Sequence, residues 1–152
     1  MLNIRSAKAD EYKILTNIAI ESESFWEYDS DHIEKFKAVY KVTEEFISSN
    51  STFVIEKDGN IVGFYGFIIE NNEPSLEYLY IKPQYINKGY GKLLWKHMVA
   101  NCKNNNIREF SVVTSLQTRE FYTKMGAVQV GEIESLVQKG NKIPLLTYTL
   151  EK

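Results

Sequence analysis

The segment between residues 76 and 125 restricts the possible folds more than any other part of this chain. Leu76 to Ile81 is a short run of apolar and β-favouring residues, and a turn containing Gly89 and Gly91 leads from it into an amphipathic helix. A second strand-like run, Phe110 to Thr114, is followed by a second helix. This order indicates a mixed α/β sheet with a β–α–β–α passage.

The residues before this segment predict helices and then a β-hairpin. Apolar side chains recur at helical spacing after Asp10, after Ser30, which is the predicted N-cap, and after Thr43. The strand-like runs 52–57 and 61–69 are joined by an Asp-Gly pair, the strongest short-range hairpin signal. Two further strand-like runs near the end of the chain complete an α/β pattern.

The composition excludes several classes of protein. With 152 residues and a mass of 17.6 kDa, residues 1–152 have room for a single domain. The 18 basic and 20 acidic side chains give a net charge of -2, which argues against a general nucleic-acid binder. No apolar run approaches the roughly 18 residues that cross a bilayer. Since the first residues also lack a signal-peptide pattern, we expect a cytoplasmic protein with no membrane partner.

The cysteine and histidine content gives no indication of a metal site. Cys102 is the single cysteine, which excludes an intramolecular disulfide and a cysteine-rich metal centre. His32 and His97 are isolated, and two histidines far apart in the sequence do not predict a metal site. We therefore expect no metal cofactor.

The glycine turn before the helix has two interpretations. Backbone N–H groups at a helix N-terminus, approached closely at glycine, form an anion site, to which Lys88 and Lys92 would add charge. Alternatively, the glycines allow tight packing of a strand against a helix. The turn is not a dinucleotide fingerprint, because Leu94 replaces the third glycine, and it is not a P-loop, because Ile86 and Leu93 replace residues that motif requires.

Together, these motifs resemble those of the GCN5-related N-acetyltransferase (GNAT) superfamily. The chain matches both glycines of the family turn, Gly89 and Gly91, and the pair Phe121-Tyr122 on the following helix. It departs from the family pattern at Ile86, where Gln or Arg is usual, and at Ser115, where Asn is common. The resemblance implies a mixed, mostly antiparallel central sheet flanked by helices. In that fold a splayed pair of strands forms a wedge for acetyl-CoA.

The resemblance also assigns residues to the coenzyme. It implies that acetyl-CoA lies between the strands 76–81 and 110–114, where strand backbone groups pair with the pantetheine arm. It places the pyrophosphate on the backbone amides of the glycine turn, and a backbone amide near Tyr80 against the thioester oxygen. The implied coenzyme-binding residues are Leu79, Tyr80, Ile81, Asn87, Lys88, Gly89, Tyr90, Gly91, Lys92, Ser115 and Phe121.

Tyr122 is the candidate general acid. The departing thiolate of coenzyme A needs a proton, and a phenol with a pKa of about 10 is protonated at neutral pH and can supply one. The alternative is that Phe121-Tyr122 is a core pair on the last helix. The position of the pair after the glycine turn, at the family spacing, favours the catalytic interpretation.

Glu77 is the candidate general base. The attacking amine must be neutral, so a carboxylate, directly or through water, has to accept its proton. Strand alternation predicts that Glu77 shares a face with Leu79 and Ile81, and that this face lies toward the acceptor. The alternative is a solvated charge on the strand.

The acceptor site is predicted in the aromatic segment between the first two helices. Phe25, Trp26 and Tyr28 lie there, and their rings would enclose a small amine or stack on a cation, unless they pack in the core. The function predicted is acetyl transfer from acetyl-CoA to a primary amine of a small molecule, by direct attack in a ternary complex. The alternatives are acetylation of protein N-termini or lysines, and an acyl-CoA-binding module without turnover. The resemblance also raises the possibility of a homodimer.

Overall fold

A mixed β-sheet forms the centre of the molecule. The computed structural model describes residues 1–26, 29–137 and 140–150. Within them, seven strands join in the order β1-β2-β3-β4-β5-β7-β6, and all neighbours are antiparallel except β4 and β5. The strands are β1 (Leu2–Ser6), β2 (Ser51–Lys57), β3 (Asn60–Glu70), β4 (Glu73–Ile81), β5 (Glu109–Val113), β6 (Val128–Glu134) and β7 (Lys142–Thr149).

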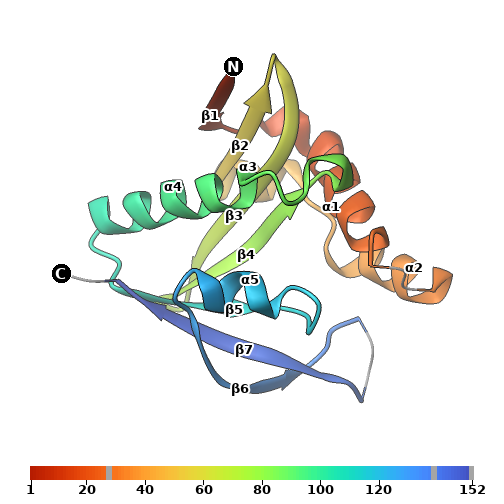
Figure 1. Cartoon of the computed structure of the whole chain (residues 1–152), viewed down its shortest axis with the longest axis vertical. Helices are drawn as coiled ribbons and strands as arrows, with labels where there is room; N and C mark the ends of the chain where they lie inside the picture. The colour runs from red at the N-terminus through yellow and green to blue at the C-terminus, as the bar shows by residue number, and fades with distance from the viewer. Residues whose placement is uncertain (27–28, 138–139, 151–152) are drawn as a thin grey trace.

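Helices cover both faces of the sheet (Figure 1). One core cluster joins one face to α1, α2 and α3, and another joins the opposite face to α4 and α5. The expected mixed, mostly antiparallel sheet flanked by helices is thereby confirmed. The α-helices are α1 (Tyr12–Ser24), α2 (Ser30–Val39), α3 (Glu44–Ser49), α4 (Tyr90–Asn104) and α5 (Arg119–Lys124), and Ala9–Glu11 and Pro83–Tyr85 form 3₁₀ turns. Within the described ranges, no helix combines the length and apolar character needed to cross a bilayer.

Local sequence signals explain several element boundaries. The β2–β3 hairpin turns at Asp58 and Gly59, both with positive φ (52° and 83°), as an Asp-Gly hairpin turn requires. Thr43 caps α3 as predicted, by accepting a hydrogen bond from a backbone N–H of the first turn. The predicted cap of α2 is wrong by one residue. Asp29 caps this helix through its carboxylate, and Ser30 is the first helical residue.

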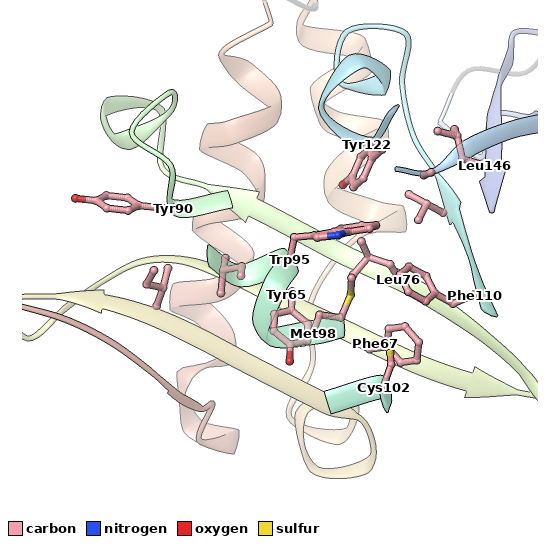
Figure 2. Close-up of a cluster of buried hydrophobic side chains, with 14 of the residues drawn as sticks. Tyr65, Phe67, Leu76, Tyr90, Trp95, Met98, Cys102, Phe110, Tyr122 and Leu146 are labelled. Atoms are coloured by element: carbon pink, nitrogen blue, oxygen red, sulfur yellow. The ribbon is translucent and has the colours of Figure 1, made fainter. Parts of the chain in front are cut away.

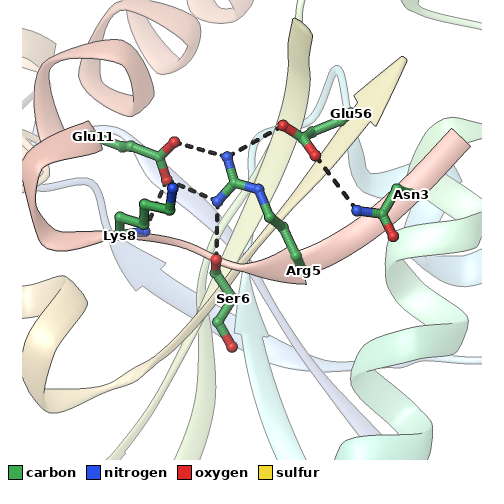
Figure 3. Close-up of polar contacts among 6 residues, drawn as sticks. All are labelled: Asn3, Arg5, Ser6, Lys8, Glu11 and Glu56. Carbon is green, nitrogen blue, oxygen red and sulfur yellow. Dashed lines mark hydrogen bonds and ion pairs between the residues drawn. The ribbon is translucent and has the colours of Figure 1, made fainter. Parts of the chain in front are cut away.

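A polar network ties the first strand to its neighbours (Figure 3). The Arg5 guanidinium donates to both carboxylate oxygens of Glu11, at 3.0 and 2.7 Å, and to Glu56 of β2 at 3.2 Å. Asn3 donates to the same Glu56 carboxylate. Hydrogen bonding to Arg5 holds the pKa of Glu11 below its usual value. The network fixes the 3₁₀ turn from which α1 departs.

Aromatic packing around Trp95 fixes α5 against the sheet. The Trp95 ring lies 5.6 Å from the ring of Phe110 on β5, 5.1 Å from that of Tyr148 on β7 and 5.9 Å from that of Tyr122 on α5. Figure 2 shows Tyr122 beside Trp95, above the other side chains that α4 directs into the core. Cys102, on the same helix, is buried. Since contacts from three elements converge on Trp95, α5 holds a defined position beside β5.

Candidate active site

The sheet opens between β4 and β5. These parallel strands are in register only at Ser75 with Ser111 and at Leu76 with Val112. Beyond these pairs, in the described residues, β4 has no neighbouring strand on this side. An unpaired strand edge can form backbone hydrogen bonds to an extended ligand. The splayed strand pair expected from the sequence is confirmed.

A β-bulge occurs on β4 where the two strands separate. Gly66 of β3 lies opposite Tyr78, but its neighbour Phe67 lies opposite Leu76, so Glu77 is an extra residue on β4. A bulge bends its strand and increases the local twist. The bend coincides with the end of β4–β5 pairing and therefore contributes to the gap between these strands.

The bulge changes the face on which Glu77 acts. Leu79 and Ile81 pack against the core cluster beneath α4. Leu76, directly before Glu77, packs in this same cluster, whereas Tyr78 and Tyr80 pack in the opposite cluster beneath α1 and α2, where the Glu77 carboxylate raises the pKa of Tyr40. The expectation that Glu77 shares a face with Leu79 and Ile81 is therefore wrong, because the extra residue interrupts the two-residue alternation of the strand.

A cavity of about 480 Å³ occupies the gap between the strands and extends to α1 and α2. Its β4 wall includes Glu77, and its α5 wall includes Tyr122. Burial raises the pKa of Glu77, and the nearby Glu70 carboxylate raises it further. The predicted site residues that line this cavity are Trp26, Glu77, Leu79, Tyr80, Ser115 and Tyr122. These six residues come from four separate parts of the chain, which meet where the sheet opens.

Tyr122 has the chemistry of a protonated phenol in this cavity. Its side chain is 7% exposed, and its ring packs against Trp95 and, at 5.1 Å, against Phe121. Burial raises the pKa of Tyr122 well above its usual value, because a phenolate would lose its hydration. The hydroxyl makes no hydrogen bond to another described side chain. A proton donor is therefore positioned at the cavity.

Ser115 connects the cavity to the start of α5. Its hydroxyl lies 2.9 Å from that of Thr118, which also forms a hydrogen bond with the Thr114 hydroxyl. The Ser115 carbonyl accepts a hydrogen bond from the Arg119 N–H at 3.0 Å. These bonds hold the turn that carries the polypeptide from β5 into α5.

The glycine turn at the start of α4 exposes backbone donors. Asn87 and Gly89 have positive φ, at 67° and 86°. The helical hydrogen bonds of α4 begin with the Leu93 N–H and the Gly89 carbonyl, at 3.1 Å. The N–H groups before Leu93 lack an intrahelical acceptor, as at every helix N-terminus. Lys88 and Lys92 are exposed beside them. This turn lies outside the cavity lining and suits a phosphate group.

Gly91 has a packing role in addition. A Cβ built there would lie 3.2 Å from Cε1 of Phe121, so the first turn of α4 contacts the ring on α5 closely. Tyr90 is buried in the core, so only its backbone can serve a ligand. The tight-packing interpretation therefore applies at Gly91, and the anion site stays a prediction.

The predicted acceptor residues have different positions. Trp26 lines the cavity. Phe25 does not; its side chain is 45% exposed and packs edge-on against Trp26, with ring centroids 5.0 Å apart. Tyr28 lies outside the described residues. Phe36 and Tyr40, stacked at 5.0 Å, complete this aromatic wall.

Sequence reasoning missed a polar pair in the same wall. Glu23, in the last turn of α1, and His32, in the first turn of α2, are joined at 2.7 Å between Oε2 and Nε2. Both line the cavity. His32 had been interpreted as isolated, because its partner lies on another helix. Across residues 1–26, 29–137 and 140–150, no group of three or more potential ligands among His, Cys, Asp and Glu is placed to hold a metal ion.

Comparison with known proteins identifies the family. A family model described as an acetyltransferase (GNAT) domain matches residues 25–152. The chain belongs to the GNAT family. It is therefore an acyltransferase, and acetyl-CoA is its co-substrate. The open β4 edge and the exposed amides before α4 are features of this structure that fit an extended pantetheine arm and a pyrophosphate.

One curated relative and two solved structures illustrate which proteins this acetyltransferase is similar to. A curated relative from Bacillus subtilis (strain 168), a candidate ribosomal protein bS18-alanine N-acetyltransferase, is 29% identical over 70% of this acetyltransferase and 69% of the relative. The PaiA N-acetyltransferase of Thermoplasma acidophilum, solved with coenzyme A, superposes with a TM-score of 0.83 at 21% identity, covering 99% of each chain. The ribosomal-protein-S18-alanine N-acetyltransferase of Escherichia coli has a TM-score of 0.70 at 12% identity, covering 100% of this acetyltransferase and 96% of that chain. The two structures share the fold.

Proposed function

We propose that this acetyltransferase moves the acetyl group of acetyl-CoA to a primary amine of a small molecule, by direct attack in a ternary complex. The observation that carries the proposal is the cavity at the β4–β5 gap, which combines a buried phenol, a half-buried carboxylate and an aromatic wall. Such a set can remove one proton, supply another and enclose an amine.

The chain offers two sets of groups to the coenzyme. The backbone of Leu79, Tyr80 and Ile81 belongs to the unpaired edge of β4 and would pair with the amides of the pantetheine arm. The backbone amides from Asn87 to Lys92 would hold the pyrophosphate, with the two exposed lysines adding positive charge. The bound coenzyme supplies an activated acetyl group as a thioester.

Proton transfer is assigned to two side chains. Glu77, whose pKa is raised by burial, accepts the proton of the attacking amine directly or through water. A backbone N–H near Tyr80 stabilises the negative charge that develops on the carbonyl oxygen. As the C–N bond forms and the C–S bond breaks, Tyr122 donates its proton to the departing sulfur. Neutral thiol and acetylated amine leave, and the proton accepted by Glu77 returns to the phenolate through solvent.

Acetylation of a protein N-terminus is the second candidate function. The name of the Bacillus subtilis relative supports it, since that protein is a candidate enzyme for an alanine N-terminus. A protein acceptor requires a groove through which a polypeptide can extend. The aromatic wall formed by Trp26, Phe36 and Tyr40 favours a compact amine instead.

Thiol release from acetyl-CoA tests these functions directly. The purified protein is assayed with a panel of small primary amines and with peptides that begin with alanine, and the acetylated product is identified by mass spectrometry. We expect turnover with small amines. Turnover with peptides alone would refute the small-molecule proposal. Binding of acetyl-CoA without thiol release in either panel would show a coenzyme-binding module.

A further inference from the structure

Burying the Glu23–His32 pair costs free energy of hydration, and binding of a ligand in the cavity would give this pair a function. The two side chains are 15% and 7% exposed, so the carboxylate has lost most of its hydration. With the carboxylate ionised, Nε2 of His32 must carry the proton, because a carboxylate only accepts hydrogen bonds. The described part of the chain provides no second hydrogen bond for this carboxylate, which leaves Oε1 for a ligand.

His32 holds the carboxylate in position. Its backbone N–H donates a hydrogen bond to Asp29 Oδ1 at 2.8 Å, and this bond fixes the first turn of α2. Its imidazole then reaches across to the end of α1 at Glu23. A carboxylate anchored at one oxygen between two helices presents the other oxygen with little loss of side-chain entropy on binding.

The cavity contains two separate negative points. Glu23 and Glu77 both raise the pKa of Tyr40, so each acts on the same tyrosine. Glu23 lines the cavity from α1 and Glu77 lines it from β4, so the two carboxylates belong to different walls. Among the described residues that line the cavity, Lys142 is the single lysine or arginine, and it is exposed at the start of β7. Among the described lining residues of α1 and α2, His32 is therefore the single basic side chain beside the acidic Glu23.

Aromatic rings lie in the same wall. Trp26, Phe36 and Tyr40 line the cavity together with Glu23 and Glu77. Ring faces attract cations, and they also pack against methylene groups. Acidic groups separated by rings suit a molecule with two positively charged ends and an apolar middle.

We propose that Glu23, positioned by His32, binds a second cationic group of the acceptor, so that the preferred acceptors are aliphatic diamines rather than monoamines. The assignment rests on the proposed function of this cavity. One amino group, at Glu77, first releases its ammonium proton to solvent, attacks as the neutral amine and passes a second proton to Glu77 as the C–N bond forms, while the other remains charged at Glu23. Glu23 is then a specificity-determining residue, and His32 is a positioning residue.

A diamine and a monoamine of equal chain length distinguish the role of Glu23 in acceptor binding from the acetyl-transfer step itself. The kcat and KM for 1,4-diaminobutane and for n-butylamine are measured by thiol release in the wild type and in Glu23→Gln. We expect the wild type to favour the diamine at least about tenfold in kcat/KM, since hydrogen bonds to charged groups are stronger than those between neutral groups. Glu23→Gln should raise the KM for the diamine by a similar factor, with kcat and the monoamine constants little changed.

Matched variants show whether the diamine preference depends on the charge of Glu23 or on its position in the cavity. Glu21→Gln removes an exposed carboxylate from the same helix turn and should leave both amines unaffected. His32→Gln should weaken the diamine selectively, and Glu23→Asp should restore part of the preference. If Glu23→Gln does not fold, the wild-type preference and the Glu23→Asp variant decide the question.

Each outcome is informative. Equal kcat/KM for the two amines in the wild type, or an equal loss for both in Glu23→Gln, would overturn the diamine assignment and leave the acetyltransferase mechanism intact. Absence of turnover with every small amine would instead refute the proposed function, and the assignment of Glu23 with it.

Discussion

Replacing Tyr122 by phenylalanine removes one hydroxyl and tests the proposed general acid directly. The ring keeps its contacts with Trp95 and Phe121, at 5.9 and 5.1 Å. The hydroxyl makes no hydrogen bond to a described side chain, so its loss leaves no partner unpaired. We therefore expect Tyr122→Phe to fold normally, with a free energy of unfolding within about 0.5 kcal/mol of the wild type.

The expected effect lies in turnover. The site that raises the pKa of Tyr122 by burial also disfavours an unprotonated thiolate, because both anions lose hydration there. Without the phenol, the sulfur has to leave as that anion or take a proton from water. General acids typically contribute about 10²- to 10⁴-fold. A buried phenol is a weak acid, so we expect a loss in kcat of at least about tenfold, or about 1.4 kcal/mol in the barrier.

The assay is steady-state thiol release with the best amine, at saturating acetyl-CoA. Tyr148→Phe is the matched control, because Tyr148 also contacts Trp95, at 5.1 Å, but does not line the cavity. The control should keep its kcat. If Tyr122→Phe turns over at the wild-type rate, Tyr122 is not the acid, and Phe121-Tyr122 is a core pair only.

Two further predictions concern β4 and its neighbour. Glu77→Gln should lose about 10²-fold in kcat/KM. The active form of Glu77 is the carboxylate, so the wild-type rate should fall as the pH drops through the raised pKa of this group. The variant should lack this decrease in rate at low pH. An unchanged pH–rate profile would exclude Glu77 as the base. Gly63→Ala should destabilise the fold by about 1–3 kcal/mol, since its Cβ would lie 2.9 Å from the Tyr80 carbonyl oxygen. Gly131→Ala, with nothing within 4 Å, should change stability by less than about 0.5 kcal/mol in urea unfolding, and equal effects of the two alanines would contradict this reasoning.

Local patterns predicted most of the architecture correctly. The Asp-Gly pair predicted the β2–β3 hairpin because positive φ is tolerated there, and the glycine turn predicted the start of α4. The family resemblance, carried by Gly89, Gly91 and Phe121-Tyr122, predicted the splay between β4 and β5. Each of these signals depends on residues close together in the chain.

The errors and omissions share a nonlocal cause. The face of Glu77 could not be read from strand alternation, because the bulge is defined only by pairing with Gly66 and Phe67 of β3. Phe25 and Trp26 are adjacent and equally aromatic, yet only Trp26 lines the cavity. Which of two neighbouring rings is inward depends on the path of the chain after α1.

The sequence by itself determined the order of helices and strands, the position of the glycine turn before α4 and the presence of a phenol at the family position. These properties follow from backbone preferences and residue chemistry within a few positions. Only the tertiary structure decided that Glu23 and His32 form a buried pair and that Glu77 acts beneath α1 and α2. Contacts between residues of different elements depend on how helices pack and where a sheet bends, and these follow from the whole core rather than from any one segment.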